Sequence, residues 1–174
     1  MLLRLFKIIC FCVVITACNK NAQQTQAVTT KNIDSSSITE KDIEKLKYID
    51  FALDPKAEVL AEPWLAYNQL KTTVENVKKA DFSFFDDDDQ AVFLLIKDLR
   101  RNIPDTLKTQ SVLSRITIVE NMLYKLEETY QLRTTVKPEL AASIKALLIS
   151  YSNLNFQLNK KLEKDNQNIA RPNS

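Results

Sequence analysis

The chain has 174 residues, 45% of them hydrophobic and 26% charged, with a formal net charge of +2 and with neither glycine nor histidine. The absence of glycine excludes a phosphate-binding P-loop, a dinucleotide-binding glycine fingerprint and a nucleophile elbow, because each needs a backbone position that only glycine tolerates. The absence of histidine excludes Ser-His-Asp and Cys-His catalysis and imidazole zinc sites.

The N-terminal segment has the pattern of a secretory signal. Residues 1–7 contain Arg4 and Lys7 but no acid, and residues 8–15 form an unbroken apolar run, IICFCVVI. A basic start, a short apolar centre and small residues before a cleavage site are typical of such signals. The run is far shorter than the ~20 residues that span a bilayer as a helix, which argues against a permanent transmembrane anchor.

This run ends in Ile15-Thr16-Ala17-Cys18, which resembles the lipobox of bacterial lipoproteins, where an aliphatic residue and two small residues precede a cysteine. The resemblance implies that residues 1–17 are a signal peptide, that the chain is cut before Cys18, that the Cys18 sulfur carries a diacylglyceryl group through a thioether, and that the new amine is usually acylated. Two or more acyl chains hold a protein stably on a lipid bilayer. The alternative is an ordinary cleaved signal in which Cys18 is incidental.

Cleavage before Cys18 also changes the composition of the mature chain. Cys10 and Cys12 leave with the signal, so no second cysteine remains for a disulfide within the chain. The loss of Arg4 and Lys7 leaves equal numbers of basic and acidic residues. A neutral body lacks the basic footprint of a nucleic-acid-binding protein, so we expect no nucleic-acid partner.

Polar segments flank the body of the protein. Residues 18–38 comprise Cys18 and a polar stretch that is too poor in large apolar side chains to offset the entropy of ordering, which predicts a flexible tether. Residues 164–174 are also polar and predict a flexible tail. We expect residues 39–163 to form one helical domain.

The domain begins with a helix-start signal. Thr39 and Asp42 have the spacing of a capping box, in which a hydroxyl and a carboxylate bind exposed backbone N–H groups. Ile43, Leu46 and Ile49 follow as a short apolar stripe.

Two prolines divide the next stretch. Asp54 before Pro55 predicts a second helix start, with a capping carboxylate and a proline in the first turn. Pro63 predicts a kink or a restart near Glu62, because proline removes an N–H and clashes with the preceding turn. A stripe with steps of three and four residues comprises Leu60, Trp64, Tyr67, Leu70, Val74 and Val77.

A third helix is expected from near Asp86 to a point before Pro104. Its AVFLLI run also fits a buried strand, but the acids before it and the KDLRRN sequence after it favour a helix. One face of this helix would carry Val92, Leu95, Ile96, Leu99 and Ile103.

The last two predicted helices have the clearest periodicity. The apolar residues of the first are Val112, Ile116, Val119, Leu123, Leu126 and Tyr130. Those of the second, which Pro138 opens, are Leu140, Ile144, Leu147, Tyr151, Leu154, Leu158 and Leu162. Such spacing puts the side chains of a helix on one stripe, and stripes on helices joined by short loops bury each other. The sequence therefore predicts an all-α fold, an antiparallel helical bundle of four to five helices after a disordered tether.

Two segments of the body are similar to those of uncharacterised helical lipoproteins from Gram-negative bacteria. They are ADFSFF at residues 80–85 and SNLNFQLNKKLE at residues 152–163. The resemblance implies no activity.

The four consecutive acids Asp86 to Asp89 are the most conspicuous polar cluster, and Asp81 lies nearby. Calcium needs six to eight oxygen ligands, but neighbouring helical residues point about 100° apart and the turning glycine of a calcium loop is missing. We interpret the acids as a complement to the positive end of a helix, with Arg100 and Arg101 at its negative end. We expect no metal ligand and no cofactor.

Two groups of residues are candidates for binding a partner. Phe82, Phe84 and Phe85 lie between predicted helices, where they either plug one end of the bundle or form an exposed anchor. Asn155 and Asn159 share a helix face. That face forms a recognition stripe, a polar network with Arg115 or Glu120, or a solvated surface.

No catalytic set emerges, because no pair of acids has a spacing that singles it out for hydrolysis. We therefore expect a non-catalytic protein that is held on a lipid bilayer by acylated Cys18 and binds or scaffolds an envelope protein. Asn19 follows the cysteine without an acidic run, which resembles the sorting signal for the periplasmic face of the outer membrane rather than the cell membrane. The alternatives are an inhibitor or immunity-type lipoprotein that blocks an envelope enzyme, and a carrier of an apolar ligand.

Overall fold

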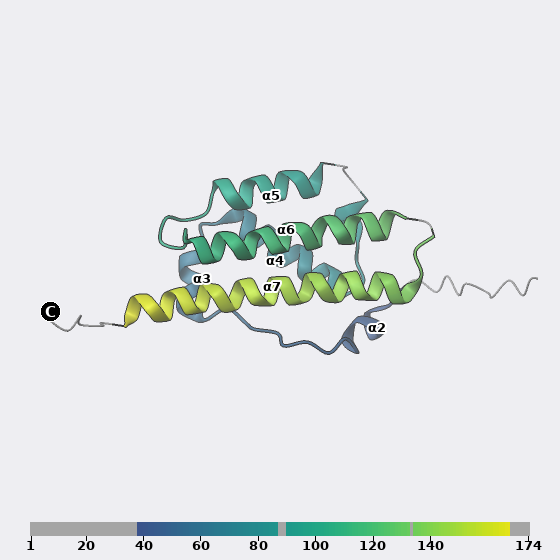
Figure 1. The fold of residues 1–174 in the computed structure, drawn as a ribbon, viewed down its shortest axis with the longest axis horizontal. Coiled ribbons are helices and arrows are strands. Elements are labelled where there is room, and N and C mark those ends of the chain that lie inside the picture. The colour runs from purple at the N-terminus through teal and green to yellow at the C-terminus, as the bar shows by residue number, and fades with distance from the viewer. Residues whose placement is uncertain (1–37, 87–89, 133, 168–174) are drawn as a thin grey trace, which may run out of the picture. The chain divides into compact units, whose positions relative to one another are not determined.

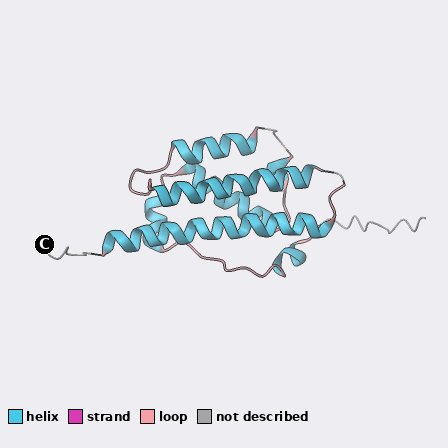
Figure 2. Cartoon of the chain, in the orientation of Figure 1, coloured by secondary structure: helices cyan, strands magenta, loops and turns pink. Residues whose placement is uncertain are grey.

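The computed structural model describes residues 38–86, 90–132 and 134–167 (Figure 1). This part of the chain contains six α-helices, one short 3-10 helix and no strand (Figure 2). The predicted all-α helical bundle is confirmed. The signal, Cys18 and nearly all of the tether lie outside the described residues, as does the tail beyond residue 167.

The four longest helices form the bundle. They are α4 (Leu65–Lys78), α5 (Ala91–Arg101), α6 (Gln110–Gln131) and α7 (Lys137–Asn166). Each packs against the next, α7 packs against α4, and consecutive helices run in opposite directions (Figure 1). Helix α7 continues past Glu163, where the domain was predicted to end. No helix of the described residues is long and apolar enough to span a membrane.

Two short helices, α2 (Glu40–Glu44) and α3 (Pro55–Ala61), precede the bundle. Their starts confirm the signals in the sequence: Thr39 and Asp42 form a capping box, and the Asp54 carboxylate accepts a hydrogen bond from the N–H of Lys56. The predicted interruption at Pro63 is also confirmed, since α3 ends before it and α4 begins after it. These short helices raise the count above the predicted four to five.

The predicted apolar stripes form one continuous core. Leu60, Tyr130, Leu140 and Leu162 are half-buried, and the other stripe residues of α4 to α7 are buried. Ile49 was wrongly assigned to a stripe and is 71% exposed. Helix α2 ends at Glu44, so the helical spacing that would have turned Ile49 inward no longer applies.

Helix α5 begins at Ala91, later than predicted, and no residue of its first turn is acidic. Before it, a 3-10 helix, η1 (Ser83–Phe85), turns the chain so that Phe85 is buried. Asp86 caps the C-terminal end of η1 and is therefore not the start of α5. Arg100 and Arg101 do lie in the last turn of α5, as predicted from the helix dipole.

Helix α4 ends in a Schellman motif that has alanine where glycine is usual. Ala80 has a positive φ of 61°, the N–H of Asp81 donates to the carbonyl of Asn76 at 2.9 Å, and the N–H of Ala80 donates to the carbonyl of Val77 at 3.0 Å. The Cβ of a non-glycine residue is strained in this left-handed region. The chain therefore carries local strain at a position that glycine would relieve.

We expect Ala80→Gly to raise the free energy of unfolding by about 0.5–1 kcal/mol. Relief of the left-handed strain, about 1–2 kcal/mol, exceeds the extra entropy of glycine in the unfolded chain, about 0.4–1 kcal/mol. Urea unfolding followed by circular dichroism measures the change. The control Ala142→Gly, at an exposed position inside α7, should destabilise by about 1 kcal/mol. Destabilisation by both variants would contradict the strain at Ala80.

The Asp42 carboxylate joins α2 to the start of α7. Lys137 Nζ lies 2.8 Å from Asp42 Oδ2, and the N–H and hydroxyl of Thr39 also donate to this carboxylate. The hydrogen bond from Lys137, and then those from Thr39, hold the pKa of Asp42 far below its ordinary value of 3.8. Because the folded pKa is the lower one, this stabilisation is complete above pH 3.8 and is lost as pH falls through the folded value.

In an NMR titration we expect the Asp42 carboxyl carbon to titrate below pH 3.8. Lys137→Met should raise that midpoint because it removes the largest contribution, while the Thr39 hydrogen bonds still keep it depressed. The same midpoint in both proteins would show that Lys137 does not bind Asp42 in solution.

Candidate functional site

A non-helical strap, residues 46–54, connects α2 to α3 and runs along α7 (Figure 1). Three polar side chains of α7 bind its backbone: Ser152, Asn155 and Asn159. Their spacing of three and four residues places them on one helix face. They take the place of the sheet or helix partners that the strap backbone lacks.

Ser152 and Asn155 bind the middle of the strap. The Ser152 hydroxyl accepts from the N–H of Phe51 at 2.8 Å and donates to the carbonyl of Ile49 at 2.7 Å. Asn155 Nδ2 donates to the carbonyl of Phe51 at 3.1 Å. The Phe51 ring packs on Phe156, with ring centroids 4.7 Å apart. These contacts position the part of the strap that faces α4.

Asn159 binds the end of the strap. Its Nδ2 donates to the carbonyl of Ala52 at 2.9 Å, and its Oδ1 accepts from the N–H of Asp54 at 2.8 Å. Since Asp54 is also the N-cap of α3, the amide of Asn159 fixes where the strap becomes a helix.

Of the alternatives for Asn155 and Asn159, the polar network with Arg115 or Glu120 does not form among the described residues. Asn155 is only 4% exposed, which also rules out a solvated surface at this position. Glu120 forms an ion pair with Arg100 of α5. The amides of Asn155 and Asn159 bind the chain's own strap, and their role in binding a partner stays a prediction.

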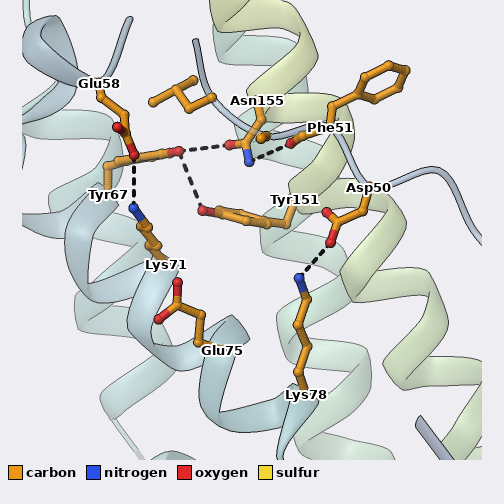
Figure 3. Close-up of a pocket in the computed structure, with 11 residues that line it drawn as sticks. Asp50, Phe51, Glu58, Tyr67, Lys71, Glu75, Lys78, Tyr151 and Asn155 are labelled. Atoms are coloured by element: carbon orange, nitrogen blue, oxygen red, sulfur yellow. Dashed lines mark hydrogen bonds and ion pairs between the residues drawn. The ribbon is translucent and has the colours of Figure 1, made fainter. Parts of the chain in front are cut away.

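The strap, α3, α4 and α7 line a cleft of about 240 Å³, which we call the strap cleft (Figure 3). At its floor, the hydroxyl of Tyr67 donates to Asn155 Oδ1 at 2.8 Å and lies 3.4 Å from the hydroxyl of Tyr151. Burial raises the pKa of Tyr67 well above its usual range, and the Tyr151 hydroxyl adds to the rise. Tyr67 therefore remains a neutral hydrogen-bond donor at physiological pH.

Two ion pairs lie at the rim of the strap cleft. Lys71 Nζ is 3.1 Å from Glu58 Oε1, and Lys78 Nζ is 2.7 Å from Asp50 Oδ2 (Figure 3). The hydrogen bond with Glu58 is the main cause of a raised pKa at Lys71. Burial opposes the charge of Lys78, but its contacts with Asp50 and Tyr48 outweigh burial and raise its pKa. Both lysines are therefore charged and neutralised by neighbouring carboxylates.

Glu75 completes the rim between the two lysines. It is exposed, and in the part of the chain that the structure describes it forms no ion pair. Lys71, Glu75 and Lys78 follow one another at steps of four and three residues, so they share one face of α4. The strap cleft thus combines a neutral hydrogen-bonding floor with a rim of alternating charge.

The three phenylalanines predicted as plug or anchor lie at one end of the bundle. Phe82 and Phe85 are buried, and Phe84 is half-buried and packs on the core. Phe82 stacks on Tyr130 with ring centroids 4.9 Å apart, and Phe84 contacts Phe85 edge to face at 5.3 Å. This packing is that of a plug, and a role of these rings in binding a partner stays a prediction.

The described acids near this plug have structural contacts. Asp81 Oδ1 accepts from the N–H of Ser83 at 3.0 Å, and Asp86 Oδ2 accepts from the Tyr130 hydroxyl at 3.1 Å. Residues 87–89, the rest of the predicted acidic cluster, lie outside the described residues. Among the described residues, no group of three or more Asp, Glu, Cys or His side chains could hold a metal ion.

Comparison of the chain with protein-family models, with curated proteins and with solved structures finds no match. What this chain binds must therefore be inferred from its own residues.

None of the rim residues of the strap cleft is predicted as a site residue from the sequence. The available signal is on α7, where Ser152, Asn155 and Asn159 form a polar stripe beside the apolar stripe. Polar side chains next to a buried stripe indicate that something covers them. They do not indicate that the covering segment precedes them by about a hundred residues.

Proposed function

We propose that this protein is a membrane-anchored lipoprotein that faces the periplasm and acts there by non-catalytic binding or scaffolding. The observation that carries the proposal is Ile15-Thr16-Ala17-Cys18 at the end of a signal-like segment. Acylation of Cys18 would hold the helical bundle at the bilayer through the tether. Asn19 after the cysteine favours the outer membrane.

The chemistry of the strap cleft supports a binding role. Its lysines are neutralised by carboxylates, Tyr67 at its floor stays protonated, and Asn155 is engaged with the strap backbone. Groups held in this way can donate and accept hydrogen bonds without changing their charge. Proton transfer, by contrast, is favoured by groups whose pKa lies near the working pH.

The two alternatives have less support. An inhibitor of an envelope enzyme would present an exposed aromatic or polar patch, at residues 82–85 or 155–159, but Phe82, Phe85 and Asn155 are buried. A carrier of an apolar ligand needs an enclosed apolar cavity. The cleft beside the plug, about 410 Å³, is open and has Asp81 and Asp86 in its lining.

Metabolic labelling with a fatty acid, followed by cell fractionation, tests the proposed anchor. The wild-type protein should take up label and fractionate with membranes, whereas Cys18→Ser should lose both properties. Cys12→Ser is the matched control, because it changes a cysteine inside the signal and should leave labelling and fractionation as in the wild type. An unlabelled wild-type protein in the soluble fraction would refute the anchor.

A further inference from the structure

The strap cleft has the size of a site for one small molecule. Its volume of about 240 Å³ lies just below the roughly 300–1,000 Å³ typical of sites for drug-sized ligands. Polar groups reach it from the strap, α3, α4 and α7 (Figure 3). These groups support the binding role proposed above, so the ligand class argued here rests on that role and is independent of the lipid anchor.

The charges at the rim discriminate against charged ligands. A ligand carboxylate or phosphate would have to compete with Glu58 for Lys71 or with Asp50 for Lys78. A ligand ammonium at Glu75 would lie between the two lysine ammonium groups, which are one helical turn away on either side. A neutral ligand leaves both ion pairs intact.

The floor of the cleft offers a hydrogen bond that the protein itself makes poorly. The Tyr67 hydroxyl donates its hydrogen bond to Asn155. Among the described residues, the Tyr151 hydroxyl has one side-chain partner, the Tyr67 hydroxyl, at 3.4 Å. That distance is long for a hydroxyl–hydroxyl hydrogen bond, which is usually about 2.7–2.8 Å. Tyr151 is only 7% exposed, and a poorly satisfied buried hydroxyl gains from a better partner.

We propose that the strap cleft binds a small, neutral, polyhydroxylated molecule of the carbohydrate class, with the size of one sugar ring. Each ligand hydroxyl can donate and accept at once. It thereby matches a rim in which lysine donors alternate with carboxylate acceptors, with Glu75 as the acceptor that no ion pair occupies. A further ligand hydroxyl would accept a hydrogen bond from the Tyr151 hydroxyl at the floor.

A binding panel tests the ligand class on the purified full-length protein. The neutral probes are glucose, galactose, N-acetylglucosamine and myo-inositol, and the charged probes are glycine, methylammonium and inorganic phosphate. Backbone amide NMR should show saturable shifts for at least one neutral probe, at the strap and around Lys71, and tighter binding than for every charged probe. Absence of saturable binding by all four neutral probes would overturn the proposal, and so would preference for a charged one.

Two variants locate the binding. Tyr151→Phe keeps the ring but removes the hydroxyl, and Glu75→Ala removes the rim acceptor at an exposed position where folding should be unaffected. Each should weaken binding about tenfold, equivalent to about 1.4 kcal/mol. The control Tyr124→Phe removes a hydroxyl on α6, which does not line the cleft, and should bind as the wild type does. Wild-type affinity in both Tyr151→Phe and Glu75→Ala would overturn the proposed site, whatever fractionation shows about the anchor.

Discussion

Leu99→Ala should lower the free energy of unfolding by about 3 kcal/mol, within the range of about 2–5 kcal/mol for a leucine truncated in a packed core. Leu99 lies in the last turn of helix α5, AVFLLIKDLRR, and is fully buried in the common core. The truncation removes apolar contacts and leaves a cavity that rigid neighbouring helices cannot fill completely. Urea unfolding of the purified protein, followed by circular dichroism, measures the change.

Leu94→Ala is the matched control for this core prediction. Leu94 belongs to the same helix but is 46% exposed, so the same truncation should cost about 1 kcal/mol or less. If Leu94→Ala and Leu99→Ala lowered the free energy of unfolding equally, Leu99 would not lie on the face of α5 that packs in the core.

Asn155→Ala should lower the free energy of unfolding by about 2–4 kcal/mol. The substitution removes the acceptor for the buried Tyr67 hydroxyl and the donor to the Phe51 carbonyl. The Tyr67 hydroxyl keeps only the long contact of 3.4 Å with the Tyr151 hydroxyl. A buried polar group without a good partner costs about 1–3 kcal/mol, beyond the loss of the second hydrogen bond. Amide hydrogen exchange in the strap should accelerate, because Asn155 is one of three side chains that hold it to α7.

Asn153→Ala is the control for the strap contact. Asn153 lies two residues earlier in α7, is half-buried, and makes no side-chain hydrogen bond with the described residues. Its substitution should change stability by about 0.5 kcal/mol or less and leave strap exchange unchanged. If Asn153→Ala and Asn155→Ala behaved alike, the strap would not depend on the polar stripe of α7.

The sequence was sufficient to predict the bundle because the information for it is local and repeated. Each long helix carries an apolar residue every three or four positions, Pro55 marks the start of α3, and Pro63 marks the break between α3 and α4. For α5, the flanking charged residues favoured a helix over a buried strand, and the structure confirms the helix. The predicted stripes form the core of the structure because the apolar stripe of one helix is buried by packing against the stripes of its neighbours.

The start of α5 and the strap could not be predicted because they depend on contacts between distant residues. Phe82 and Phe85 are buried against the bundle end, where Tyr130 lies, and this delays α5 beyond Asp86. The backbone of the strap is bound by α7 side chains about a hundred residues later. The spacing of apolar residues within a helix cannot predict either contact, since both depend on how the folded helices pack against distant parts of the chain.

The intact mass of the mature protein, extracted from membranes and measured by mass spectrometry, tests the anchor most directly. We predict a chain that begins at Cys18 and carries a diacylglyceryl group on its sulfur, through a thioether, and an acyl group on its amine. A chain that retains residues 1–17, or one whose Cys18 is unmodified, would contradict the membrane-anchored function proposed for this bundle.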